Sequence, residues 1–179
     1  PFLPEDVDSL DEDRDVLARY YAAVALYQSL AGEALRDLSI VAGVRDAVFG
    51  TQEHFIGRRA SRLRALTREG RRGLVERHPS DDIEVFSRRN LEEGLLTEEQ
   101  FGRLGSLLER ELTGVPAPRL HVFLHAEPDR LRERIRRRGR PQERDLVRPD
   151  NPYLEELNRL YLRWYERCGG DKMIIRTDA

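Results

Sequence analysis

Short apolar segments separated by long amphipathic stretches are the feature that most constrains the fold of this chain. Residues 73–77, 120–125 and 172–176 are rich in apolar side chains and are bounded by glycine, proline or charged residues. Such segments are typical of buried strands. Because helical stretches lie between them, successive strands need crossover connections, and the sequence predicts a parallel sheet of the α/β class.

Apolar residues recur at helical spacing through most of the remaining chain. Thr97-Glu98-Glu99-Gln100 resembles a capping box, which predicts the start of one helix. The first residues, up to about residue 12, are expected to form an irregular acidic lead-in. The predicted helices span residues 13–38, 44–67, 80–93, 97–112, 129–138 and 151–167.

Composition narrows the class of protein. The 179 residues suit one domain, and no apolar run approaches the ~20 residues of a membrane-spanning helix. The 31 basic and 33 acidic residues leave a net charge of −2, so no overall basic field favours nonspecific nucleic-acid binding. The single cysteine, Cys168, excludes an intramolecular disulfide framework and fits a reducing compartment.

Charged residues follow the first predicted strand at Glu76, Arg77 and His78. In open α/β sheets, ligands bind beyond the carboxyl ends of the strands. A carboxylate at that edge can hold Mg²⁺, and a neighbouring arginine can bind the phosphates that the metal also contacts. A structural ion pair at the strand end explains the same residues, and spacing alone leaves both interpretations open.

Arginines form a second cluster, in the helix predicted at residues 129–138 and in the turn after it. Arg134 and Arg138 share one helix face and Arg140 follows in the turn, so three guanidinium groups can converge on one polyanion such as a triphosphate. A solvated basic face or an RNA-binding patch is the alternative interpretation.

Histidines and aromatic residues carry weaker signals. The four histidines show no zinc-binding spacing, and His121 and His125 are expected at a sheet end or in a loop. Tyr153, Tyr161, Trp164 and Tyr165 recur along one predicted helix, which favours a structural role in a core or a subunit interface.

Four motifs follow one another along the chain. They are Gly73-Leu-Val-Glu76-Arg77-His78 with Asp82, Leu120-His-Val-Phe-Leu-His-Ala-Glu-Pro128, Arg134-Ile-Arg-Arg-Arg138-Gly-Arg140, and Asn151-Pro-Tyr-Leu-Glu-Glu-Leu157. Together they resemble the deoxynucleoside kinase family over most of residues 49–179. The resemblance implies a P-loop kinase-like fold, a three-layer parallel sheet flanked by helices.

The same resemblance implies an activity and its partners. The family transfers the γ-phosphoryl group of ATP to the 5′-hydroxyl of a deoxynucleoside, with Mg²⁺ as the metal. By resemblance we also expect a homodimer, without nucleic acid or membrane as a partner, in the cytoplasm, with a mitochondrial location left open.

Residues of the nucleoside pocket are assigned by resemblance. Gln52 looks like the glutamine that pairs with the nucleobase edge, since its amide offers a donor and an acceptor together. Phe55 is similar to a residue that lines the base pocket. Arg59 and Asp82 resemble an arginine and an aspartate that act together near the base.

Residues of phosphoryl transfer are assigned in the same way. Glu76 resembles the metal-associated acidic residue, and Arg77 the arginine that contacts the substrate 5′-oxygen and phosphate. The segment 134–148 resembles the family's lid. The resemblance implies that Arg134, Arg138 and Arg140 close over the donor phosphates, and that Glu143 is a lid partner to the substrate.

The sequence departs from the family pattern at the phosphate loop. No Gly-x-x-x-x-Gly-Lys-Ser/Thr motif occurs, and the single lysine, Lys172, lies in the last predicted strand. Because the chain begins at Pro1 and its only methionine is Met173, we expect a segment before Pro1, and the family continues beyond Ala179.

We therefore expect one partial kinase-like domain over residues 1–179, incomplete at both ends and without the first strands. Activity is expected of the complete protein and little of these residues alone. One alternative is a catalytically inactive kinase-like protein that binds nucleosides or acts as a scaffold. Another is an arginine-rich RNA-binding module, against which the near-neutral charge counts.

Overall fold

The structure is a computed structural model that describes residues 2–3, 11–30 and 38–178. The chain divides into two compact units, Pro1–Val115 and Pro116–Ala179. The single domain expected from the sequence stays a prediction. Within the described ranges, no helix is both long and apolar enough to cross a membrane.

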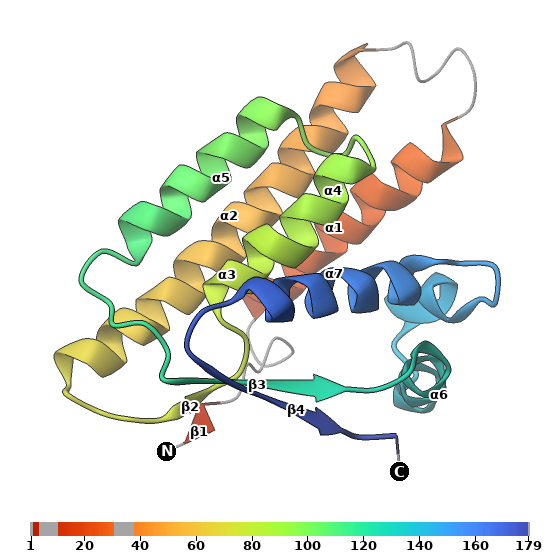
Figure 1. The fold of residues 1–179 in the computed structure, drawn as a ribbon. Coiled ribbons are helices and arrows are strands. Elements are labelled where there is room, and N and C mark those ends of the chain that lie inside the picture. Colours follow the sequence, from red (N-terminus) through yellow and green to blue (C-terminus); the bar gives the residue numbers. More distant parts are fainter. Residues whose placement is uncertain (1, 4–10, 31–37, 179) are drawn as a thin grey trace. The chain divides into compact units, whose positions relative to one another are not determined.

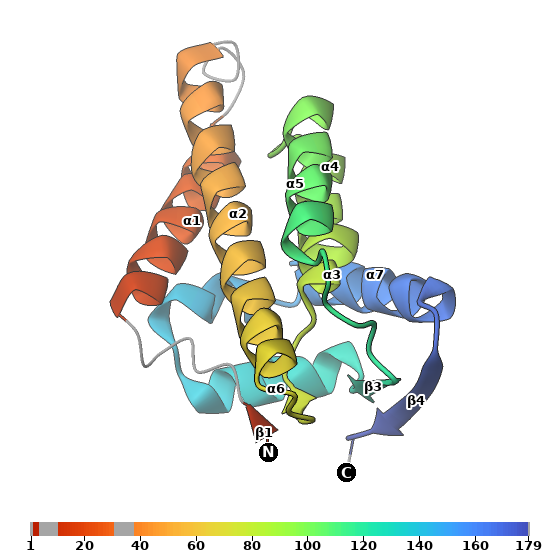
Figure 2. The same ribbon diagram turned by 90° about the vertical axis from the view of Figure 1, so that its left-hand side faces the viewer.

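The first unit is mainly helical. Of its three long helices, α2 contacts both α1 and α5 (Figures 1 and 2). The short π-helix η2 packs against α2 and α5. Its elements are β1 (Phe2–Leu3), α1 (Asp11–Ser29), α2 (Leu38–Arg68), β2 (Leu74–Val75), α3 (Pro79–Asp81), the π-helix η2 (Asp82–Ser87), α4 (Arg88–Glu92) and α5 (Glu98–Glu111).

Helix α2 forms the centre of this unit. Its apolar residues Val44, Val48 and Ile56 are buried at helical spacing, and they belong to one cluster with Leu95 and Leu104. Burying each such side chain contributes about 1.5–3 kcal/mol relative to exposure. This packing fixes the buried side of α2, on which the polar residues of the candidate site also lie.

Local sequence signals set the start of α5. The capping box is confirmed: the Gln100 backbone N–H donates to Thr97 Oγ1 at 3.1 Å, and the Thr97 N–H donates to Gln100 Oε1 at 3.1 Å. Two otherwise unpaired backbone donors of the first helical turn are satisfied in this way.

The second unit contains a βαβ arrangement. Strands β3 (Leu120–His125) and β4 (Asp171–Arg176) are parallel, with Leu120 opposite Asp171 and His125 opposite Arg176. Between them the chain forms α6 (Pro128–Arg138), the 3-10 helix η3 (Pro141–Val147) and α7 (Tyr153–Arg167). Both strands match the predicted segments to within one residue.

Aromatic side chains join α7 to β3. The ring of Tyr161 stacks on Phe123 with centroids 5.7 Å apart, and Trp164 meets His121 edge-on at 5.4 Å. Alternate residues of a strand point to opposite faces, so His121 and Phe123 share the face that α7 contacts. The structural interpretation of the aromatic stripe is confirmed.

The sheet differs from the expected one. The predicted α/β class and parallel pairing are found, but the described strands form two separate pairs, β1 with β2 and β3 with β4, rather than one sheet. Phe2 and Leu3 pair with Leu74 and Val75, although residues 1–12 were expected to be irregular. Two paired residues between prolines are too short for an alternation pattern to reveal. The expected incompleteness at both ends stays a prediction.

The first predicted helix also differs in length. Helix α1 ends at Ser29, and α2 already begins at Leu38. The predicted continuation over residues 31–37 lies outside the described residues.

Candidate active site

The residues after β2 adopt an unusual backbone. Arg77 has a φ of 59°, and among the described residues it is the non-glycine residue with a positive φ. Such a conformation costs a residue with a Cβ atom roughly 1–2 kcal/mol, and strain of this kind clusters at functional sites. It turns the chain sharply between the exposed carboxylate of Glu76 and the start of α3.

His78 begins the next helical segment. Its Nδ1 accepts a hydrogen bond from the Ser80 backbone N–H at 3.2 Å and lies 2.7 Å from Ser80 Oγ, so the imidazole caps α3. The helix then widens into the π-helix η2, which begins at Asp82. Short π-helical turns are rare and frequently occur at functional sites.

Asp82 and Arg59 form a buried ion pair. Arg59 Nη1 donates to Asp82 Oδ1, and each residue is only 2% exposed. Arg77 approaches the same oxygen, with its Nη2 at 3.9 Å. Two arginines, one from α2 and one from the turn after β2, therefore converge on a single carboxylate at the start of η2.

Gln52 and Phe55 precede Arg59 on the same side of α2. The guanidinium of Arg59 lies over the Phe55 ring, 4.9 Å from its centroid. Gln52 is 5% exposed, and its amide makes no hydrogen bond within the part of the chain that the structure describes. The donor and the acceptor of this amide are therefore not used by the described residues.

Phe86 contacts the candidate site, and the sequence analysis did not single it out. The Arg77 guanidinium lies 4.3 Å from the centroid of the Phe86 ring, in a cation–π contact. Phe86 follows Asp82 by one helical turn, so the signal was an aromatic residue on the same helical side as the aspartate. Each of the two arginines near Asp82 therefore lies over an aromatic ring, Arg59 over Phe55 and Arg77 over Phe86.

The residues of the second unit that the resemblance assigns to a lid are partly brought together. Glu143 is 7% exposed and accepts hydrogen bonds from Arg138 Nη2 at 2.7 Å and from Arg140 Nη1 at 3.5 Å. Arg134 instead donates to Thr177, at 3.0 Å to its Oγ1. Arg138 and Arg140 thus share one carboxylate, and Arg134 binds the end of β4.

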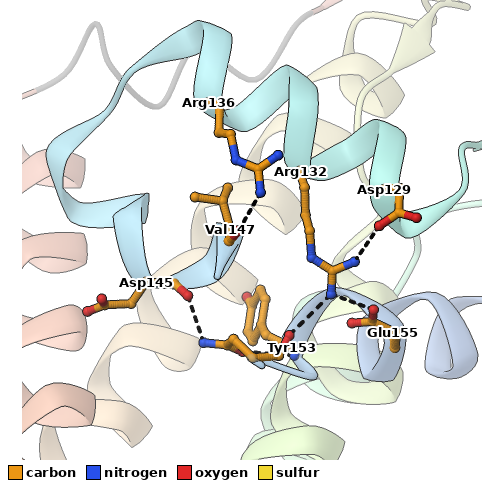
Figure 3. A network of polar contacts seen from close by, with 8 residues as sticks. Asp129, Arg132, Arg136, Asp145, Val147, Tyr153 and Glu155 are labelled. Atoms are coloured by element: carbon orange, nitrogen blue, oxygen red, sulfur yellow. Dashed lines mark hydrogen bonds and ion pairs between the residues drawn. The ribbon is translucent and has the colours of Figure 1, made fainter. Parts of the chain in front are cut away.

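Two further arginines of α6, Arg132 and Arg136, connect this helix to neighbouring segments. Figure 3 shows Arg132 of α6 reaching Asp129, at 3.0 Å, and Glu155 of α7. Arg136 donates to the Val147 carbonyl at 2.8 Å (Figure 3). These contacts connect α6 to α7 and to the end of η3. Arg132 and Arg136 thus hold the helices together, whereas Arg138 and Arg140 contact Glu143.

The only lysine is used within the fold. Lys172 Nζ donates to the carbonyls of Tyr165, at 3.0 Å, and Glu166, at 2.9 Å, near the end of α7. A cation at this helix end satisfies carbonyls that lack helical partners.

Known proteins are similar to this chain over most of its length. Deoxyguanosine kinase from Lactobacillus acidophilus is similar to this chain, with 28% identity over 173 residues that cover 91% of this chain and 73% of that enzyme. Residues 48–177 match the deoxynucleoside kinase family, a range that contains Gln52, the turn after β2 and the lid residues. Since this match covers most of the chain, the protein belongs to the deoxynucleoside kinase family.

Proposed function

We propose that the protein is a deoxynucleoside kinase that transfers the γ-phosphoryl group of ATP to the 5′-hydroxyl of a deoxynucleoside. Family membership supports nucleoside kinase activity in general. The observation that carries the finer proposal is the buried Gln52 amide, without a partner among the described residues, on the same helix side as the Arg59–Asp82 pair.

Base recognition would use the polar groups of α2. The Gln52 amide can donate and accept at once, which matches the adjacent donor and acceptor on a nucleobase edge. Phe55 offers an apolar face beneath Arg59. The ion pair with Asp82 holds the Arg59 guanidinium in place, so its remaining donors are oriented before the base binds.

Acceptor and metal would meet at the turn after β2. Arg77 is oriented by Asp82 and Phe86 and would bind the 5′-oxygen and the phosphate that forms on it. The exposed carboxylate of Glu76 fits Mg²⁺, which binds proteins through one or two carboxylates together with substrate phosphates. When bound, the ion neutralises charge on the phosphates.

The lid would complete the donor side. Arg138 and Arg140 would exchange their contact with Glu143 for the phosphates of ATP, and Arg134 would leave Thr177. Guanidinium groups placed where charge develops stabilise the transition state more than the ground state. Glu143 would then be released to the substrate side.

Replacement of Gln52 tests this proposal in the full-length protein. Gln52→Ala removes two hydrogen bonds to the base, each worth about 0.5–1.5 kcal/mol, so the nucleoside Kd should rise roughly 10- to 100-fold. The ATP Kd should stay unchanged. Calorimetric titration with a panel of deoxynucleosides and with ATP measures both constants.

Gln28→Ala is the matched control, because Gln28 is exposed on α1. An equal loss of nucleoside and ATP affinity in Gln52→Ala would contradict the assignment to the base pocket. Nucleoside binding without any turnover in the full-length protein would instead support the inactive nucleoside-binding alternative.

A further inference from the structure

Three potential metal ligands lie together at one end of the β3–β4 pair. They are His125, the last residue of β3, Glu127, which precedes α6, and Asp178, which follows β4. One ligand atom from each lies within 4.8 Å of the other two. All three belong to the second unit, and none is among the residues assigned above to nucleoside or phosphate binding.

Backbone contacts fix this arrangement. The Thr177 N–H donates to the His125 carbonyl at 2.8 Å, which extends the pairing beyond the last register position of the two strands. The Glu127 N–H donates to Asp178 Oδ1 at 2.8 Å. The Asp178 carboxylate is therefore held against the start of α6, and its second oxygen is left for another partner.

The His125 imidazole is an independent observation that points to a ligand. The residue is 8% exposed, and within the described part of the chain neither ring nitrogen makes a hydrogen bond. Its ring meets Phe123 edge-on, with centroids 5.8 Å apart. The side chain is thus more than nine-tenths buried, and one of its ring nitrogens lies within 4.8 Å of an oxygen of each carboxylate.

The carboxylates of Glu127 and Asp178 are not neutralised by the nearby arginine side chains. Neither Glu127 nor Asp178 forms an ion pair with a described residue, although α6 is rich in arginine. Arg130 pairs with Glu133 at 2.8 Å and reaches only the backbone carbonyl of Asp178. Two carboxylates without a cationic side chain match the charge of one divalent ion.

We propose that His125, Glu127 and Asp178 bind a divalent transition-metal cation, with Zn²⁺ as the best fit. An imidazole nitrogen with carboxylate oxygens suits Zn²⁺, whereas Mg²⁺ prefers oxygen ligands alone. Three protein ligands leave a fourth tetrahedral position for water. Because Glu127 is exposed and Asp178 half-buried, side-chain rotation can bring their oxygens to the ion. This site does not depend on the proposed kinase activity.

Zinc titration of the metal-free full-length protein tests the site. Zn²⁺ binding is measured by competition with a chromophoric chelator, and Co²⁺ is used as a second probe because its visible absorption reports a tetrahedral site with nitrogen and oxygen ligands. Loss of a group that only orients a ligand weakens metal binding by about 10- to 100-fold, so His125→Gln, Glu127→Gln and Asp178→Asn should each weaken Zn²⁺ binding at least about 100-fold.

His121→Gln and Asp171→Asn are the matched controls, a histidine of the same strand and an exposed aspartate at the start of β4. They should bind Zn²⁺ as the unchanged protein does. Asp178→Asn changes a residue outside the strands and the core, so its result stands even where His125→Gln disturbs folding. The proposal is overturned if the protein does not bind Zn²⁺ with a Kd below about 100 µM, or if Asp178→Asn binds Zn²⁺ as tightly as the unchanged protein.

Discussion

The buried Arg59–Asp82 pair affects stability and belongs to the proposed nucleoside site. Both side chains are removed from water, and the cost of desolvating two charges offsets most of their attraction. Replacing both partners with apolar residues is therefore often neutral. Removing one partner is not, because the other charge stays buried without compensation.

We expect Asp82→Asn to lower the free energy of unfolding by about 3–5 kcal/mol, since Arg59 then keeps an uncompensated buried charge. The double variant Arg59→Met, Asp82→Leu should recover most of this stability and still lose nucleoside binding. Urea unfolding measures the stability of each variant.

Asp150→Asn is the control, because Asp150 pairs with Arg148 at 2.9 Å on the surface with 70% of its side chain exposed. An exposed pair of this kind contributes little to stability, because solvent screens the two charges. Equal destabilisation by Asp82→Asn and Asp150→Asn would show that the buried pair is not coupled as described.

Arg138 can be tested for its role at the lid. Arg138→Ala should lower kcat at least about 100-fold, because a donor aimed at developing charge is lost, with little change in the KM for nucleoside. Arg137→Ala removes an exposed neighbouring guanidinium and should leave kcat nearly unchanged. Steady-state kinetics of the full-length protein separates the two, and an unchanged kcat in Arg138→Ala would remove this residue from the transition state.

At the scale of helices and strands, we expect the contact between α6 and α7 to depend on pH. The hydrogen bond from Arg132 holds the pKa of the Glu155 carboxyl below its ordinary value of 4.5. A carboxyl whose pKa is lower in the folded state stabilises the fold above its unfolded pKa, and this stabilisation is lost as pH falls through the folded pKa.

Glu155→Gln should therefore reduce stability at pH 7 by up to about 1 kcal/mol, as expected for a partly exposed pair. The difference from the unchanged protein should disappear as the pH falls below 4.5. Thermal unfolding at several pH values measures it, with Glu166→Gln, on the exposed part of α7, as the control. A difference that persists at low pH would show that packing, and not charge, is lost in Glu155→Gln.

The hydrophobic pattern of the sequence predicted where strands lie better than which strands pair with each other. The strands at residues 120–125 and 171–176 were found because apolar runs bounded by chain breakers are local signals. The pairing of β1 with β2 was missed, since it joins residues that lie far apart in the sequence and each contributes only two positions.

At the scale of the whole molecule, the residues of the candidate site could not be found from periodicity alone. Gln52, Phe55, Arg59 and Asp82 all entered through the family resemblance, and their roles stay predictions. Helical spacing is consistent with the first three lying on one side of α2, but no local signal connects Asp82 with them. The zinc site was missed because its ligands come from the ends of two strands, where no fixed spacing connects His125 with Asp178.

The left-handed backbone at Arg77 has a consequence for how such a protein can be engineered. Glycine adopts this conformation without steric cost, so a selection for heat resistance alone would favour Arg77→Gly. That substitution would also delete the guanidinium beside Asp82 and Phe86. Libraries screened only for thermal stability would thus select stable variants that lack the proposed phosphate-binding arginine. A second screen for turnover must therefore be applied at every round.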